Sequence, residues 1–466
     1  MMRVSIACCL LPKNCIFAPC MKRPILLSDH FTIGKLLRFT VPSMVMMVFI
    51  SIYSVVDGFF VSNFAGTTSF AALNLIFPFI MFLSVIGFVF GAGGTALIAK
   101  TLGEGKPVEA NRIFSMLVYL GAICGVLFAA IGWPFLDEVS ILLGADEALL
   151  GECVMYGRIL LLAMPFFMLE IMFHSMLIAA EKPNLGLIVT LIAGGLNMAL
   201  DALFIAGFGW GLKGAAWATA LSQLSGATIP LVYFIVPNKS RLQLGRPVFD
   251  GAALRQTCFN GISEFFSNIS AAMVAMFYNY QLMRYIGEDG VAAYGVVMYV
   301  AFIFAAVNIG YGMGSGPIVS FHYGAGNRDE LRNVFTKSMM LIGIMGLTEF
   351  LFAQLLARPL SQVFVGYDPD LLALTTHALR IYGISFLLMG FNGYASAFFT
   401  ALNNGLVSAL ISTNRTMVCE TLAVLLLPVL FGVNGIWFAI IFAECAALVL
   451  TVIMLVRNGS RYGYLR

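Results

Sequence analysis

Thr101-Leu-Gly-Glu-Gly-Lys-Pro-Val-Glu-Ala-Asn-Arg-Ile-Phe114 returns later in the chain as His322-Tyr-Gly-Ala-Gly-Asn-Arg-Asp-Glu-Leu-Arg-Asn-Val-Phe335. Gly103 recurs as Gly324, 221 residues further on, and the same offset relates other glycines, alanines and acids of the two stretches. The matched pairs are Gly105 with Gly326, Glu109 with Glu330, Phe114 with Phe335, Gly91 with Gly312, Gly93 with Gly314 and Gly66 with Gly287. The chain therefore contains two halves of similar design.

Both halves are strongly apolar. Hydrophobic residues make up 60% of the chain and charged residues 11%, whereas a soluble domain is closer to half apolar and a quarter charged. Continuous apolar runs predict membrane-spanning helices, and their lack of alternation excludes a β-barrel. We predict an all-α membrane protein of about twelve such helices in two pseudo-symmetric six-helix lobes, a build typical of secondary transporters. The expected spans are 36–62, 69–101, 110–134, 148–180, 185–206, 212–236, 258–286, 291–323, 331–357, 371–402, 405–430 and 434–456.

Lysine and arginine gather in every second loop, which places both termini in the cytoplasm by the positive-inside rule. Residues 1–20 look unlike the rest: Cys8, Cys9, Cys15 and Cys20 lack metal-ligand spacing, so we interpret this stretch as an upstream mis-start or an unstructured tail. The expected divisions are a cytoplasmic tail at 1–35, an N-lobe at 36–236, a cytoplasmic linker at 237–257, a C-lobe at 258–457 and a cytoplasmic tail at 458–466.

Polar residues within the apolar runs are costly in a membrane, so each is a functional candidate. Tyr53 and Asp57, Asn197 and Asp201, and Thr219 and Gln223 are each four residues apart, hence on one helical face. Counting turns from the expected helix ends brings Asp57, Asp201 and Thr219 to one depth. Oxygen ligands at one depth would suit a small hard cation, and paired carboxylates would equally suit a proton. A cluster of structural hydrogen bonds between the helices is the alternative interpretation of these residues.

With these residues in place, the chain resembles the multidrug and toxic compound extrusion (MATE) family of bacteria from about residue 30 to 457. The resemblance is carried by Pro42 with Tyr53-Ser-Val-Val-Asp57 to Gly66, by Asn197-Met-Ala-Leu-Asp201, by Gly211-Leu-Lys-Gly-Ala-Ala-Trp-Ala-Thr219, by Gly310-Tyr-Gly-Met-Gly-Ser-Gly-Pro317 with Tyr323-Gly-Ala-Gly, and by Gly432-Val-Asn-Gly-Ile-Trp437. It implies two lobes around a central cleft and a first-lobe coupling site for sodium or protons. The residues matching that site are Asp57, Asn197, Asp201 and Thr219, with Tyr53 beside them.

The second lobe departs from some relatives, which carry an aspartate on helix ten where this chain has Asn392. A second-lobe sodium site therefore looks incomplete, although Glu264 matches a family acid. We expect the substrate cleft to be lined by Glu264, Asn268, Gln223, Asn392 and Tyr278. Glu170 and His174 share a helix face and are interpreted as a core pair, with a proton relay as the alternative. Arg415, Glu420 and Glu444 are interpreted as structural charges that neutralise one another.

The expected function is secondary active export of organic, often cationic, compounds across the inner membrane by antiport with sodium ions or protons. No enzymatic activity, no cofactor and no metal are expected beyond possible sodium at Asp57, Asn197, Asp201 and Thr219. The partners would be small organic cations and the lipid bilayer, with no nucleic acid, and the chain would act as a monomer. A lipid-linked oligosaccharide flippase is the nearest alternative. A membrane-embedded prenyl-chain transferase would need aspartate-rich loops, and two facing lobes suit a channel poorly.

Overall fold

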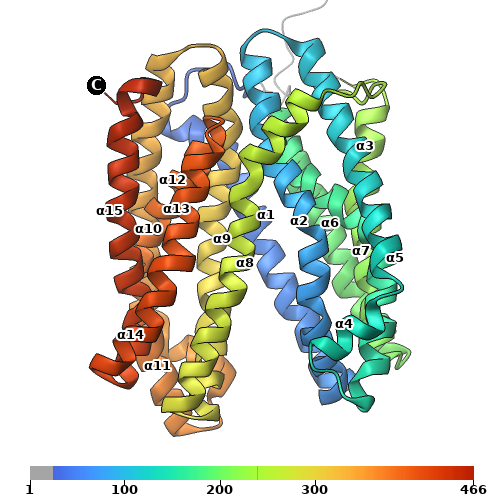
Figure 1. Ribbon diagram of the computed structural model, residues 1–466, viewed down its shortest axis with the longest axis vertical. Helices are drawn as coiled ribbons and strands as arrows, with labels where there is room; N and C mark the ends of the chain where they lie inside the picture. Colours follow the sequence, from blue (N-terminus) through green and yellow to red (C-terminus); the bar gives the residue numbers. More distant parts are fainter. Residues whose placement is uncertain (1–24, 239, 466) are drawn as a thin grey trace, which may run out of the picture.

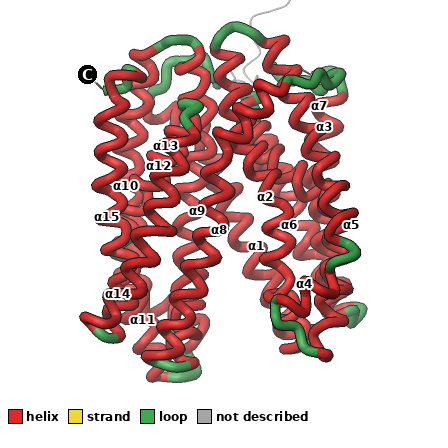
Figure 2. The backbone as a smooth tube through the Cα atoms, viewed as in Figure 1, coloured by secondary structure: helices red, strands yellow, loops and turns green. Residues whose placement is uncertain are grey.

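The computed structural model describes residues 25–238 and 240–465, so the expectation about residues 1–20 and their four cysteines lies outside the described part. All regular elements of that part are helices (Figures 1 and 2). Their bounds in the first half are α1 Ile33–Phe60, η1 Val61–Ala65, α2 Thr67–Gly103, α3 Pro107–Gly132, α4 Leu136–Leu142, α5 Glu147–Ala179, α6 Pro183–Asp201, η2 Ala202–Gly207 and α7 Gly211–Ile235. In the second half they are α8 Gly251–Tyr285, α9 Glu288–Gly324, α10 Arg328–Val365, α11 Pro369–Gly383, α12 Phe386–Ala401, α13 Gly405–Thr413, η3 Asn414–Glu420, α14 Thr421–Phe431 and α15 Val433–Tyr462.

Ten helices of the described part are long and apolar enough to cross a membrane. The pair α11 and α12, bent by 50°, counts as an eleventh span. The helix α8 has the length of a span, with 35 residues, but it carries Arg255, Glu264 and several amides and is less apolar. Eleven spans and α8 together correspond to the twelve helices expected from the sequence, so the chain is a multi-pass membrane protein.

The helices form two bundles that stand side by side (Figure 1). The N-lobe comprises α1–α7 and the C-lobe α8–α15, joined by an extended linker that runs back along α3. The linker is held there by the Asn111 amide, which donates to the Arg241 carbonyl at 3.2 Å, and by Ser115, whose Oγ accepts from the Gly245 amide at 2.9 Å. The linker is therefore part of the packed structure as well as a connection between lobes.

We call the end of the molecule that carries the α2–α3, α5–α6 and α9–α10 turns the basic end, because Lys100, Lys106, Lys182, Arg241 and Arg328 lie there. The repeated Gly-X-Gly motif sits in two of these turns. Its second glycine, Gly105 or Gly326, has a positive φ of 76° or 66°, a conformation that other residues rarely adopt. The first glycine of each motif, Gly103 or Gly324, allows the two lobes to approach closely. A Cβ on Gly103 would overlap the Phe321 carbonyl, and a Cβ on Gly324 would overlap the Lys100 carbonyl.

Further along the same helices, the lobes pack through α2 against α8 and through α9 against α1. Gly93 and Gly261 lie against each other's helices, because a Cβ on either would overlap backbone atoms of the opposite one. Their repeat counterparts, Gly314 and Thr40, also face each other. Small residues allow such close approach of helices in membranes. The ribbons of the two lobes diverge toward the opposite end (Figure 1).

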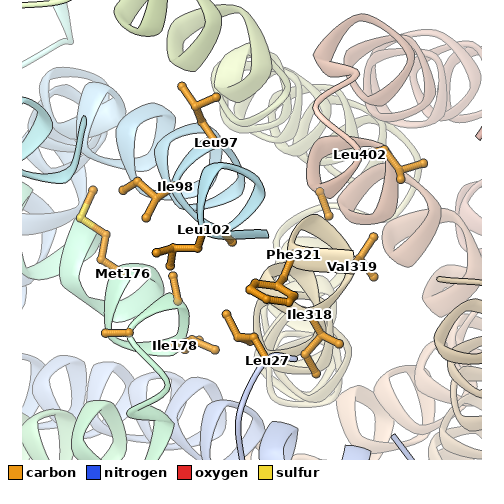
Figure 3. Close-up of a cluster of buried hydrophobic side chains, with 14 of the residues drawn as sticks. Leu27, Leu97, Ile98, Leu102, Met176, Ile178, Ile318, Val319, Phe321 and Leu402 are labelled. Carbon is orange, nitrogen blue, oxygen red and sulfur yellow. The ribbon is translucent and has the colours of Figure 1, made fainter. Parts of the chain in front are cut away.

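The N-terminal segment 25–32 lies between the lobes at the basic end. Leu27, fully buried, joins an apolar cluster formed by side chains of both lobes (Figure 3). The N-lobe supplies Leu97, Ile98, Leu102, Met176 and Ile178, and the C-lobe supplies Ile318, Val319, Phe321 and Leu402.

Two acids hold this segment, one from each lobe. Glu181, in the α5–α6 turn, accepts the Leu27 amide at 2.8 Å and pairs with Arg241 at 3.3 Å. Glu330, in the first turn of α10, accepts the Phe31 amide at 2.8 Å and lies 2.6 Å from His30 Nδ1. The segment thus ties both lobes together where they meet, whereas the sequence placed these residues in a tail.

Replacing Glu330 should weaken this closure. In Glu330→Ala the buried Phe31 amide loses its acceptor, which costs ~1–3 kcal/mol for a buried unpaired group. We expect a lower melting temperature in detergent, measured by tryptophan fluorescence. Glu109→Ala is the matched control, since Glu109 is the repeat counterpart, is half exposed and only pairs with Lys106 at 3.9 Å. Equal melting temperatures for both variants would show that the segment does not stabilise the closed end.

Candidate functional site

Asp57 and Asp201 lie where regular helices change their winding. Asp57 is in the last turn of α1, directly before the π-helical turn η1, and Asp201 is the last residue of α6, directly before η2. A π-helical turn leaves part of the backbone ladder wider than an α-helix and is frequent at functional sites. The two turns therefore mark one place in the N-lobe, toward the opposite end from the Gly-X-Gly turns.

The carboxyl groups of Asp57 and Asp201 are adjacent, within hydrogen-bonding reach of each other. Asp201 is fully buried, and neither of its oxygens accepts a hydrogen bond from any described residue. Oδ1 of Asp57 is likewise buried without a donor. Two adjacent carboxylates with so little hydrogen bonding need a compensating charge. Either a cation binds between them, or one of them takes up a proton.

Amide oxygens add to the unpaired acceptors. Oδ1 of Asn197, one turn before Asp201, and Oε1 of Gln223 on α7 are buried with no donor among the described residues. The Tyr53 ring packs over Gly194, where an added Cβ would stand 2.7 Å from the ring. Thr219 is half-buried on α7, one turn before Gln223. The N-lobe thus gathers oxygen acceptors without donors, a set that suits a small hard cation or a proton.

Two residues near this set were assigned no such place from the sequence. Tyr156 on α5 is buried in the same part of the N-lobe, near enough to feel the charges of Asp57 and Asp201. Glu170, also on α5, is buried near Tyr53 and occupies space left open by Gly226, because a Cβ there would overlap its carboxyl group. His174 forms no ion pair with Glu170, and its Nε2 has no partner among the described residues, so the expected core pair is wrong. Gly226, which leaves room for the Glu170 carboxyl group, is the sequence signal that could have located this pocket.

The residues expected to line a substrate cleft lie in different surroundings. Asn268 is exposed and donates to the Glu264 carbonyl at 2.8 Å, while the half-buried Glu264 carboxyl faces out of α8 without an ion pair among the described residues. Asn392 is fully buried, and Tyr278 stacks on Tyr294 with ring centroids 4.8 Å apart inside the C-lobe. These two side chains therefore belong to the interior of the C-lobe in this conformation.

The charges expected to neutralise one another in the C-lobe do so in part. Arg415, the second residue of η3, forms an ion pair of 2.7 Å with Glu444 on α15, whose side chain is fully buried. Asn392 donates to the other carboxylate oxygen of Glu444 at 2.7 Å and accepts from Thr451 at 2.8 Å. Glu420 lies near Arg415 but forms no ion pair with it.

Comparison with known proteins agrees with the repeat and the fold. The family model MatE matches residues 42–203 and again 265–425. The multidrug export protein MepA of Staphylococcus aureus (strain MSSA476) is 24% identical over 437 residues, which cover 91% of this chain and 94% of that protein. MepA of Staphylococcus haemolyticus (strain JCSC1435) is 24% identical over 427 residues, covering 91% and 93%.

Solved structures show the same architecture. A MATE transporter in complex with MaL6 superposes with a TM-score of 0.89 at 22% identity, covering 93% of this chain and 98% of that one. A multidrug resistance MATE family transporter of the MOP superfamily, solved in an outward-facing conformation, superposes with a TM-score of 0.88 at 22% identity, covering 93% and 97%. The family model accounts for well over half of the residues, in both halves of the chain. The chain is a member of the MatE family of membrane transporters.

Proposed function

We propose that this protein exports organic compounds of varied structure, with a preference for cations, in exchange for sodium ions or protons that enter at Asp57 and Asp201. The observation that carries the proposal is the adjacent pair of carboxyl groups in which both oxygens of the fully buried Asp201 and Oδ1 of the half-buried Asp57 have no donor among the described residues. A carboxylate pair in the membrane interior needs a positive charge, and an exchangeable cation supplies it in one state and leaves in another. Relatives named multidrug export proteins support the substrate class.

We place the basic end in the cytoplasm, as the distribution of lysine and arginine requires. The lobes then meet on the cytoplasmic side and diverge on the outer side, and the carboxylate pair lies in the outer half of the N-lobe. Asp57 is 17 residues beyond Thr40 on α1, about 25 Å along the helix at 1.5 Å per residue. We assign the protein to the plasma membrane as a monomer with both termini inside.

The alternative of a lipid-linked oligosaccharide flippase fits less well. A diphosphate would need a cluster of arginines or lysines facing the space between the lobes. Two of the helices that pack across the boundary between the lobes, α1 against α9 and α8 against α2, instead carry Asp57 and Glu264, while Arg415 is already paired with Glu444. Acidic groups there favour a cationic substrate.

A cell-based test addresses the substrate preference. Efflux-deficient cells that express the protein should accumulate less ethidium than empty-vector cells with matched membrane expression. Glu264→Gln should reduce this protection more for ethidium and quaternary ammonium compounds than for neutral or zwitterionic drugs, because a desolvated cation needs a carboxylate partner. Glu288→Gln, an exposed acid in the first turn of α9, is the control. Equal loss for charged and neutral drugs would remove Glu264 from substrate recognition.

A direct transport assay addresses coupling. Everted vesicles, whose cytoplasmic face is outside, should take up ethidium from the medium when a sodium or proton gradient is imposed, and the gradient that drives uptake identifies the coupling ion. Transport that ignores both gradients would leave export by antiport without support.

A further inference from the structure

We infer that Arg415 is a tethered cation at the C-lobe counterpart of the coupling site, so that the C-lobe exchanges no ion and coupling is confined to the N-lobe. This inference rests on the proposed function, in which Asp57 and Asp201 bind the transported ion. It assigns Arg415 a role in setting how many ions are exchanged in each cycle.

The repeat identifies the counterpart. Asp57 on α1 and Tyr278 on α8 are 221 residues apart, as are Gln223 on α7 and Glu444 on α15. The same offset relates neighbouring anchors of these helices: Gly66 with Gly287, Gly211 with Gly432 and Gly214 with Gly435. The π-helical segments follow this relation only loosely, because η2 would fall at 423–428 within α14 at this offset, whereas η3 is Asn414–Glu420, directly before α14. The oxygen acceptors around Asp201 in the N-lobe and the residues around Glu444 in the C-lobe are called here the two polar groups. By the offset of the glycine anchors, they lie among equivalent helices of the two lobes.

The two polar groups differ in how their acceptors are satisfied. In the N-lobe, both oxygens of Asp201 and the acceptor oxygens of Asn197 and Gln223 have no donor among the described residues. In the C-lobe, Glu444 accepts from Arg415 Nε and from Asn392, each at 2.7 Å. Its oxygens are fully engaged although the side chain is fully buried.

This contrast shows where each lobe obtains the positive charge that balances its buried carboxylate. A buried carboxylate is stable only when paired and hydrogen-bonded. In the N-lobe no described side chain supplies a positive charge to Asp57 and Asp201, so it must come from solution. In the C-lobe the guanidinium of Arg415 supplies it permanently, because arginine keeps its proton in proteins. A site that holds its own cation has nothing to exchange when the lobes move.

Glu420 requires separate treatment, since it is an acid near Arg415. It stands at the end of η3, half-buried and outside the ion pair, whereas Glu444 is fully buried and paired with Arg415. The inference therefore predicts that neutralising Glu420 leaves the number of exchanged ions unchanged.

The test is the number of ions exchanged per substrate, measured in proteoliposomes with ethidium as substrate and with the membrane potential clamped to zero. At each imposed gradient of the driving ion, the opposing ethidium gradient that stops net flux is determined. The slope of the logarithm of one gradient against the other gives the number of ions. A purely structural ion pair would leave this slope unchanged in any variant that still transports.

We expect Arg415→Met to raise the slope by one ion, because Glu444 must then take its cation from solution. Arg415→Met combined with Glu444→Gln should restore the wild-type slope, since glutamine is the residue at the N-lobe counterpart, Gln223. Glu420→Gln should also give the wild-type slope. Size-exclusion profiles and melting temperatures verify folding, and the double variant provides the test if Arg415→Met does not fold.

Three results would overturn the inference: an unchanged slope in a folded Arg415→Met variant, a lower slope in the double variant, or a lower slope in Glu420→Gln. The last two would show that the C-lobe exchanges an ion in the wild type. Failure of the proposed function gives a different result, in which Asp57→Asn and Asp201→Asn still couple transport to the ion gradient.

Discussion

Asp201→Asn should abolish efflux driven by an ion gradient while leaving the protein folded in the membrane. The substitution keeps the size of the side chain but removes one of two adjacent carboxylates that have no other source of positive charge. The remaining Asp57 loses the neighbouring negative charge that favours a bound cation or proton, so it binds the ion more weakly and the ion no longer drives transport. We expect gradient-driven ethidium transport to fall to the level of empty vesicles. Asp57→Asn should behave in the same way.

The expected size of the effect follows from the energy that one ion provides. One charge moved through ~100 mV supplies ~2.3 kcal/mol. That energy sustains roughly a fortyfold gradient of a neutral substrate, at ~1.4 kcal/mol per tenfold. For ethidium, itself a cation, one-for-one exchange moves no net charge, so the concentration gradient of the ion drives transport instead. Without coupling either gradient of substrate disappears.

The matched control is Asp289→Asn, which makes the same chemical change at an exposed position in the first turn of α9. Its transport should equal that of the wild type. Substrate binding offers a second comparison, because an ion and a cationic substrate that compete for the same lobe weaken each other by reciprocal linkage. Ethidium affinity that falls with added sodium or protons in the wild type should no longer do so in Asp201→Asn. Wild-type transport by Asp201→Asn would remove the coupling role from this pair.

The sequence predicted the two lobes because a repeated motif survives where backbone geometry leaves no choice. Gly105 and Gly326 need a positive φ, while Gly103 and Gly324 need the absence of a Cβ. These requirements hold for both halves and keep the offset visible. The short helix α4, Leu136–Leu142, has no repeat counterpart to signal it, and it was not predicted.

Helix boundaries show where local signals were missed. The helix α8 begins at Gly251, seven residues before the expected span, because Asp250 caps it by accepting the amides of Ala252 and Ala253. The expected span 371–402 is divided into α11 and α12, with a bend of 50° after Gly383. A Cβ on Gly383 would lie 2.7 Å from Ala353 of α10, so the bend depends on packing that no local pattern reports.

Candidate site residues could be grouped by depth, but their partners could not. Counting turns from the expected helix ends placed Asp57, Asp201 and Thr219 at one depth, and the structure brings the two carboxyl groups together. Their role in coupling remains a prediction. Asn392 shows the limit of such reasoning, because its amide is engaged by Glu444 and Thr451 of another helix. Which acceptors remain free depends on contacts between helices, and this distinguishes the two lobes.

Gly103→Ala should prevent the lobes from closing at the basic end. The added Cβ would overlap the Phe321 carbonyl of the opposite lobe, a backbone atom that cannot rotate away. Overpacking costs ~1–3 kcal/mol, and here only the closed conformation carries that cost. The equilibrium between conformations should therefore shift by roughly 5–150-fold toward the open basic end. Gly324→Ala should have the same effect through the Lys100 carbonyl.

Distances between spin labels report this shift directly. Val108 and Asp329 are exposed, lie at the basic end of opposite lobes and are repeat counterparts, 221 residues apart. Cysteines at these two positions, in a background without the native cysteines, should give a short distance in the otherwise unaltered protein. Gly103→Ala should give mainly a longer one, with transport reduced in proportion. Transport falls because the site can no longer be isolated from the cytoplasm while it opens to the outside.

Gly316→Ala is the matched control, because Gly316 is also a helical glycine of α9 and a Cβ there meets nothing within 4 Å. It should leave both the distance distribution and transport unchanged. If Gly103→Ala kept the short distance and transported normally, the glycine contact would not govern closure. The N-terminal segment held by Glu181 and Glu330 would then be the next structure to test, since it also joins both lobes at this end.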